Sequence, residues 1–213
     1  VFFAILDFGR LGFNWVMTEK AMQRAARIAT VRPPVCSGLP DVHALSTTTA
    51  SADYGGVCRA GGCEPEPTQT CVLGNVARAA DRAGCAGMDM TGMNTTAVEI
   101  WSTICPILPL QASPRNIWVS YSYDPNLGFA GGPYTPMVEV GVVTAAIETS
   151  LGGAAEELRF QFMTPIPALA AMASGGGSTS NFEDDDSNSL ADIPFPDLSV
   201  SLPGEDLNHG ING

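Results

Sequence analysis

The chain has 213 residues, of which 45% are hydrophobic and only 15% are charged, and its formal net charge is −12. This composition is typical of a folded extracytoplasmic domain and argues against a disordered chain. Half of the ten lysines and arginines lie before residue 33, so the remainder is strongly acidic and unsuited to neutralising the phosphates of a nucleic acid.

The first 32 residues are predicted to form one continuous helix, about 48 Å long at 1.5 Å per residue. Pro33 and Pro34 set its end, because the residue before a proline avoids the α region. A helix of this length is too long to be enclosed by a small domain. Apolar residues recur at helical spacing and form a predicted stripe that consists of Val1, Ile5, Phe8, Leu11, Gly12, Trp15, Met22, Ala25, Ala26 and Ala29.

The start of this helix has the character of the end of a transmembrane segment. Residues 1–6 are all apolar, but a membrane span needs about 20 such residues, so we expect the segment to begin upstream of Val1. Phe8, Phe13 and Trp15 would then lie in the interfacial zone, where aromatic residues are enriched. An amphipathic core helix is the alternative interpretation, and the aromatic residues at the start argue against it.

Small residues on the same helix indicate where another helix can dock. Gly9 and Gly12 mark a face at which a second backbone can approach closely, and Phe8 and Trp15 flank it. We therefore predict a helix-docking site made of these four residues. The cations that follow it are expected to meet anionic lipid at the bilayer surface.

Six cysteines fall between residues 36 and 105, in a loop-rich region next to the predicted anchor. An even number in that setting predicts three disulfides and an oxidising compartment, and it leaves 15 connectivities open. A zinc site built from Cys58, Cys63, Cys71 and His43 is the alternative, but no C-x-x-C spacing supports it. The predicted disulfide partners are Cys36, Cys58, Cys63, Cys71, Cys85 and Cys105.

Two further helices are predicted between the anchor and the last half of the chain. Residues 33–67 are rich in Pro, Gly, Ser and Thr and are predicted to form a long loop pinned by disulfides. A helix should then run over 68–84 and a second over 95–105, each starting at a Thr or Asn cap. Trp101 lies on the apolar face of the second helix and is expected to be buried.

The last half of the chain alternates apolar and polar residues, which predicts strands. Strands near 116–123 and 136–143, the latter in the run PMVEVGVVTAAIE, are separated by a Gly-rich turn and should form an antiparallel hairpin. A third strand near 158–163 should join the same sheet, and a fourth, edge-like strand is expected near 198–202. Residues 174–189 contain a triple glycine and the run EDDD and are predicted to form a flexible acidic loop.

The N-terminal helix and the last half of the chain carry the motifs of one protein family. In the helix these are DFGR at 7–10 after an apolar run, and an Ala/Arg-rich continuation at 23–29. In the last half they follow in order at 118–123, 127–133, 160–165 and 196–207. This order resembles the TadE family, pseudopilin-like proteins of the tight-adherence (Flp/Tad) pilus machinery. The cysteine-rich insert and the acidic loop depart from that pattern.

The predicted fold class is α+β, with a long pilin-like N-terminal helix and a disulfide-pinned head. The head should contain two short helices and a mainly antiparallel sheet of three or four strands. Residues 1–32 form the helix, as the end of a transmembrane anchor, and residues 33–213 form the extracytoplasmic head. Within the head, 33–93 is the cysteine-rich insert, and 94–213 carries one helix and the sheet.

The resemblance implies a membrane-anchored, pilin-like structural component that assembles through its helix. Its partners would be other membrane or pilin-like helices and the lipid bilayer, with no nucleic acid and no small-molecule substrate. It would be a single-pass protein of the bacterial inner membrane, with its head in the periplasm or outside the cell. The alternative is a structural accessory subunit of another membrane complex, docked through the same helix with the head as a cap.

Catalysis is not predicted, and no cofactor or metal is expected. His43 and His209 are the two histidines, and neither has the rigid setting that a catalytic triad needs. The EDDD run at 183–186 lacks the ligand alternation of a calcium loop. The Gly-rich patches lack the Lys-Ser/Thr of a phosphate-binding loop.

Overall fold

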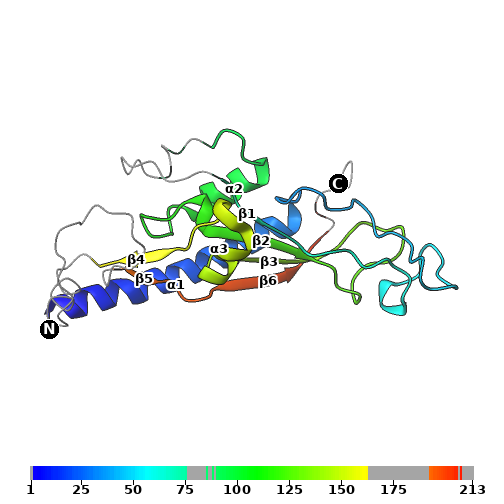
Figure 1. The fold of residues 1–213 in the computed structure, drawn as a ribbon, viewed down its shortest axis with the longest axis horizontal. Coiled ribbons are helices and arrows are strands. Elements are labelled where there is room, and N and C mark those ends of the chain that lie inside the picture. Colours follow the sequence, from blue (N-terminus) through cyan, green and yellow to red (C-terminus); the bar gives the residue numbers. More distant parts are fainter. Residues whose placement is uncertain are drawn as a thin grey trace.

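The computed structural model describes residues 2–75, 85, 88, 90–162, 192–205 and 207. Its spine is helix α1 (Phe2–Val31), which begins at one tip of an elongated molecule and runs into the head (Figure 1). A helix is therefore present where one was predicted, and it ends just before Pro33 and Pro34, whereas its role as the end of a membrane anchor stays a prediction. Among the residues described, no helix is both long enough and apolar enough to cross a bilayer.

A four-stranded antiparallel sheet forms the centre of the head, in the order β1-β2-β3-β6. Val119 of β2 lies opposite Val140 of β3, which in turn lies opposite Val200 of β6. The predictions for β2, β3 and the edge strand β6 are confirmed. The strands are β1 (Gln69–Val72), β2 (Ile117–Ser122), β3 (Met137–Val142) and β6 (Ser199–Pro203).

Helices α1 and α2 cover one face of this sheet. The C-terminal half of α1 packs on β3, β6 and α2 through small side chains, since Ala21, Ala25 and Ala29 are fully buried. Helix α2 (Thr95–Ile104) confirms the prediction for this segment, and its Asn94 cap accepts a hydrogen bond from the Thr96 N–H at 2.8 Å. Trp101 is fully buried, as expected.

The prediction of a helix over 68–84 is wrong at its start. Residues Gln69–Val72 form strand β1, which pairs with β2 from Gln69 opposite Tyr121 to Val72 opposite Trp118. Thr70 and Val72 are β-branched and favour a strand, and the hydrogen bonds to β2 override the helical spacing of the apolar residues. Residues 76–84 of the predicted helix lie outside the described residues.

The prediction for the segment directly after β3 is also corrected. The run TAAIE does not extend the strand, because Ala145–Leu151 form helix α3, followed by η4 (Gly152–Ala154). Ile147 and Leu151 of α3 pack with Trp118 and Val143, so the segment buries its apolar side chains as a helix.

Strand β4 (Arg159–Gln161) does not join the main sheet. It pairs with β5 (Asp192–Pro194) in a separate two-stranded sheet that lies beside α1 (Figure 1). Strand β4 packs against α1 instead, since the Arg10 guanidinium lies over the ring of Phe160.

Two long loops form a lobe at the end of the molecule opposite the N terminus (Figure 1). We call residues 41–64 and 123–135 the distal lobe. They are joined by backbone hydrogen bonds, such as those from the His43 N–H to the Gly132 carbonyl at 2.9 Å and from the Cys58 N–H to the Gly128 carbonyl at 3.1 Å. The lobe contains the short η1 turn (Cys58–Ala60), and η3 (Pro114–Asn116) precedes β2.

All six cysteines are paired, as predicted, and the structure supplies the connectivity. The disulfide Cys36–Cys71 ties the loop after α1 to β1 and spans 35 residues. The second links residues five apart within the distal lobe, and the third connects α2 to the chain before it. These pairs are Cys58–Cys63 and Cys85–Cys105.

Candidate functional site

The N-terminal half of α1 carries apolar side chains on the face that points away from the head. Ile5 and Phe13 are 66% and 63% exposed, and Leu6 and Val16 are also more than half exposed. Gly9 and Gly12 lie between them, and a Cβ added at either position would meet no atom within 4 Å. We call this surface the outer stripe, and it consists of Ile5, Leu6, Gly9, Gly12, Phe13 and Val16.

The opposite side of the helix carries both polar and apolar residues where it is covered, and Leu11 there packs against the hydrophobic core. Asp7 is only 2% exposed and Thr18 is fully buried. The Thr18 hydroxyl is satisfied within the helix, since it donates to the Asn14 carbonyl at 2.8 Å. An exposed row of apolar side chains opposite a buried Asp7 is not the pattern that water imposes on a surface helix.

The apolar stripe predicted from the sequence combined residues from both of these sides of the helix. Its second half, which includes Met22, Ala25 and Ala29, is buried by the head and is not available to a partner. Its first half, including Ile5 and Gly12, is exposed. The side chains missed were Leu6, Phe13 and Val16. The 100° rotation per residue places them beside Gly9, which was a usable signal.

The four predicted docking residues are all exposed. Gly9 and Gly12 lie on the outer stripe. Phe8 and Trp15, 61% and 47% exposed, lie on its flank toward the head. The Phe8 ring contacts the Phe162 ring edge to face, with centroids 6.3 Å apart.

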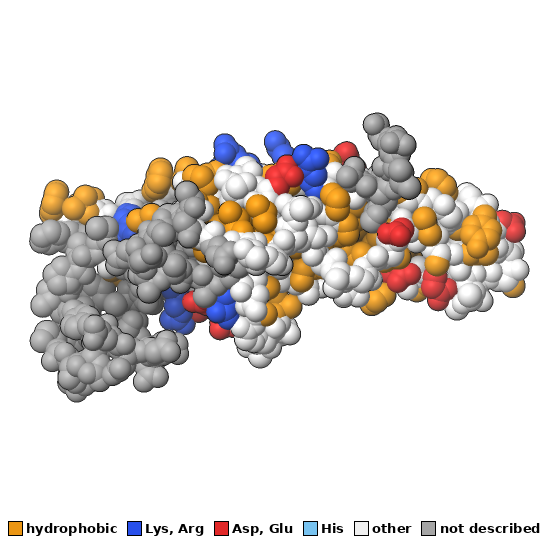
Figure 2. Space-filling view, turned by 90° about the horizontal axis from the view of Figure 1, so that it is seen from above, with side chains coloured by type: hydrophobic (Ala, Val, Ile, Leu, Met, Phe, Trp, Pro, Cys, Tyr) orange, Lys and Arg blue, Asp and Glu red, His pale blue; other side chains and the backbone are white. Residues whose placement is uncertain are grey.

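The outer stripe continues into a basic surface along the helix. Figure 2 shows blue side chains gathered at mid-length along the upper edge and orange side chains standing out toward the N-terminal end. Within the described residues, Arg24 and Arg27 make no ion pair. These cations border a hollow of about 370 Å³, which we call the basic groove. It is lined by Met17, Lys20, Gln23, Arg24, Arg27 and Ile107.

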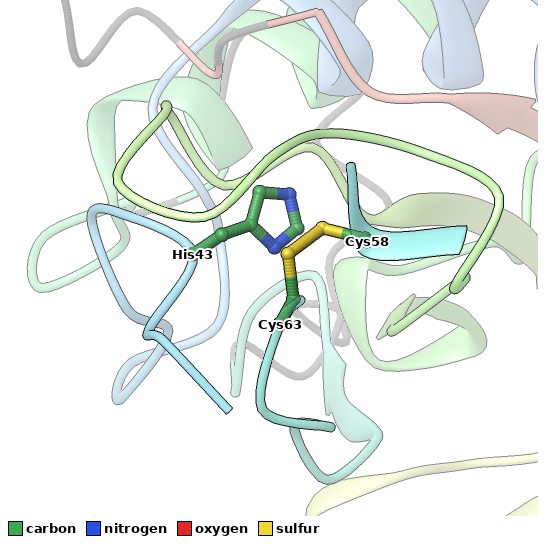
Figure 3. Close-up of side chains that lie close together, drawn as sticks. All are labelled: His43, Cys58 and Cys63. Carbon is green, nitrogen blue, oxygen red and sulfur yellow. A yellow bond between two sulfur atoms is a disulfide. The ribbon is translucent and has the colours of Figure 1, made fainter. Parts of the chain in front are cut away.

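A second cluster lies in the distal lobe, far from the outer stripe. His43, Cys58 and Cys63 are all buried, and one nitrogen or sulfur atom from each lies within 4.8 Å of the others. Figure 3 shows the imidazole directed at the Cys58–Cys63 disulfide, with the ring nitrogen nearer the side-chain stem facing the sulfurs. Cys71 of the sequence-based zinc alternative is instead bonded to Cys36.

Only one of the two ring nitrogens of His43 has a hydrogen-bond partner among the described residues. Its Nε2 lies 3.2 Å from both the backbone N–H and the hydroxyl of Thr135, whereas Nδ1 is buried without a partner among the described residues. Gly128 leaves room for the ring, since a Cβ there would lie 2.2 Å from Nε2. Burial lowers the pKa of His43, because desolvation disfavours the imidazolium.

No family model, curated protein or solved structure matches this chain. The acidic loop at 174–189, including the EDDD run, lies outside the described residues, as does His209.

Proposed function

We propose that the chain is a TadE-like, pilin-like structural component of a tight-adherence pilus system that docks through α1. The observation that carries this proposal is the exposed apolar face of the N-terminal half of α1, where Phe13 and Val16 face outward while Asp7 is buried on the opposite side. Such a helix is stable where its outer face contacts lipid or another apolar helix. The proposal gives the protein no catalytic role.

The energy available at the outer stripe is large enough to matter. Fully burying one Ile, Leu, Val or Phe side chain contributes roughly 1.5–3 kcal/mol. Ile5, Leu6, Phe13 and Val16 are 52–66% exposed, so burying the exposed part of their surface contributes about half to two thirds of that amount each. Together they offset the lower part of the estimated cost of association, which is about 4–15 kcal/mol. The two exposed glycines let a second backbone come close, which adds dispersion contacts.

The rest of the molecule supports an arrangement in which the outer stripe meets lipid or a partner helix and the head lies away from it. The C-terminal half of α1 is fixed on the antiparallel sheet, so the head and the outer stripe are displaced along one axis (Figure 1). Three disulfides in the head suit an oxidising compartment such as the periplasm. The basic groove lies between the two, where anionic headgroups would be expected.

The test is a substitution that fills the space on the outer stripe where a partner helix would pack, and that leaves the head unchanged. Gly12→Leu places a side chain in open space and replaces a poor helix former by a good one, so the fold should be retained. In cells that assemble the pilus, we expect this variant to co-purify with fewer pilin-like subunits. Gly153→Leu is the matched control, since a Cβ at Gly153 also meets nothing within 4 Å.

The outcomes separate the candidate functions. Loss of pilin-like subunits in Gly12→Leu alone supports the proposal. Recovery of subunits of a different membrane complex, lost in the same variant, would favour the accessory-subunit alternative. Equal recovery from both variants would mean that α1 is a tether without a docking face.

A further inference from the structure

The distal lobe exposes apolar side chains at the end of the molecule opposite the N terminus. Tyr54 is 76% exposed, and Val42, Val57 and Phe129 are 47–51% exposed. Single exposed apolar residues are ordinary on a protein surface, but a group of them in one small lobe marks a place where another molecule binds. Figure 2 shows apolar and acidic side chains gathered over this end of the molecule.

Tyr54 is held in place although it is exposed. Its ring leans on Gly131, since a Cβ at that glycine would lie 3.1 Å from the Tyr54 Cδ1 atom. The next residue is tied to the other loop of the lobe, because the Gly55 N–H donates to the Ala130 carbonyl at 2.8 Å. An aromatic side chain that is ordered before binding loses little entropy on binding, which is the character of an interface anchor.

The charge of the distal lobe favours a cationic partner. Asp53 is exposed, and its carboxylate makes no hydrogen bond or ion pair with another residue that the structure describes. It directly precedes Tyr54, and we call these two residues the tip pair. An arginine can bind a carboxylate and can also stack on an aromatic ring. The lobe has four carboxylates and one cation, namely Asp41, Asp53, Glu64, Asp124 and Arg59.

The basic groove on α1 has the complementary chemistry. Lys20, Arg24 and Arg27 are exposed, and Met17 and Ile107 add apolar surface to the same hollow. Its volume of about 370 Å³ lies within the range of ligand pockets, about 300–1,000 Å³, so it has room for one aromatic side chain. The groove can therefore contact the ring of an incoming tyrosine and pair with the carboxylate next to it.

We propose that the chain associates head to tail with a second copy of itself, with the tip pair of one copy seated in the basic groove of the next. The distal lobe and the groove lie at different positions along the long axis (Figure 1), so the contact is heterologous. Each dimer then keeps one unused tip pair and one unused groove, and association continues. This interface is separate from the outer stripe, so it does not rest on the proposed function.

The experiment measures association of the full chain by sedimentation velocity. Every chain carries Phe13→Ser, which weakens contacts through the outer stripe. We expect this parent chain to form oligomers whose size grows with protein concentration. Sodium chloride should weaken them, because it screens the charges at the rim of the interface. Vesicles rich in phosphatidylglycerol should compete with association, since the headgroups bind the same cations.

Two double variants test which surfaces meet. The tip variant is Asp53→Asn with Tyr54→Ser, and the groove variant is Arg24→Glu with Arg27→Glu. Each variant alone should associate about tenfold more weakly or worse, as expected for the loss of an interface anchor. A mixture of the two should form a 1:1 dimer that does not grow, because one intact tip pair can occupy one intact groove. Asp197→Asn, which removes an exposed carboxylate outside the lobe, is the control and should associate like the parent chain.

Several results would overturn the proposal. A parent chain that is monomeric at every concentration would leave the groove to lipid headgroups. Association of either variant equal to that of the parent, or a mixture that associates no better than each variant alone, would exclude contact between tip pair and groove. Denaturant unfolding checks each fold, and Tyr54→Ser or Arg24→Glu alone replaces a double variant that unfolds. None of these results affects the Gly12→Leu test, so this proposal and the proposed function fail separately.

Discussion

The guanidinium of Arg10 lies over the ring of Phe160, with its central carbon 5.0 Å from the ring centroid. This contact joins the exposed half of α1 to strand β4 and to the Phe162 ring, whose centroid lies 5.4 Å from that of Phe160. Phe160 itself is fully buried. The small β4–β5 sheet therefore braces the part of the helix that extends beyond the main sheet.

This brace predicts that Phe160→Ala is strongly destabilising. Truncating a buried phenylalanine typically lowers the free energy of unfolding by about 3–5 kcal/mol. Arg10→Met keeps the apolar stem and loses the cation–π attraction, which is worth about 0.5–1 kcal/mol, so it should be much less destabilising than Phe160→Ala. Chemical denaturation of both variants measures the difference. A similar small loss for both would show that β4 does not brace α1.

The outer stripe predicts that Phe13→Ser weakens membrane association without weakening the fold. Phe13 is 63% exposed, so the free energy of unfolding should change by no more than about 0.5 kcal/mol. Binding to phospholipid vesicles, measured by co-sedimentation, should fall. Leu110→Ser removes an even more exposed apolar side chain away from α1 and should leave binding unchanged. Equal losses in both variants would mean that exposure alone, and not the stripe, drives binding.

The basic groove predicts a dependence on lipid charge. Arg24→Gln with Arg27→Gln should weaken binding to vesicles rich in phosphatidylglycerol by about fivefold per cation, since each contributes about 1 kcal/mol near an anionic surface. Binding to phosphatidylcholine vesicles should not change. Arg59→Gln removes a cation from the distal lobe, and its binding should match that of the wild type. A wild-type chain that binds both vesicle types equally would contradict this role.

The sequence was sufficient to predict the elements whose periodicity is unambiguous. Helix α1 and strand β2 have long runs of one period, and their predicted bounds agree with the structure to within one residue. Segments 69–72 and 145–151 were misassigned because short apolar runs fit both periods, and contacts with β2 and Trp118 decide between them.

The candidate site was harder to predict than the fold. Both sides of the first half of α1 carry apolar residues, so the spacing alone did not reveal which side the head covers. His43 and Cys58 are 15 residues apart, and the distal lobe brings them together through backbone pairing that no local pattern encodes. The disulfide count followed from the number of cysteines, but the connectivity required the fold.

The connectivity predicts unequal contributions of the disulfides to stability. Removing Cys36–Cys71, which closes a span of 35 residues, should cost about 4 kcal/mol by chain entropy, and removing Cys58–Cys63, with a span of five, about 2 kcal/mol. Paired Cys→Ala variants and denaturant unfolding provide the comparison. Alkylation of the unreduced wild-type chain should modify no cysteine. A larger loss from the shorter loop would show that strain or local packing, and not loop closure, dominates.

Buried tyrosines predict a loss of stability at alkaline pH. Burial raises the pKa of Tyr121 to about 12, although a hydrogen bond from the Val35 N–H opposes the shift. Because the folded-state pKa lies above the ordinary value of about 10, the folded chain holds this proton more tightly than the unfolded chain does. The contribution is complete below pH 10 and is lost as the pH rises from about 10 to 12. Tyr134, whose pKa burial also raises to about 12, acts in the same direction.

Phenylalanine substitutions separate the two tyrosines. Tyr121→Phe should remove part of the alkaline loss but weaken the fold at neutral pH by about 1 kcal/mol, since the Val35 N–H loses its acceptor. Tyr134→Phe should remove part of the loss with no such penalty, because its buried hydroxyl has no partner among the described residues. Denaturant unfolding at pH 7 and pH 11 gives both quantities. Wild-type stability that is flat between these pH values would contradict the argument, because both phenols would then titrate alike in the folded and unfolded chains.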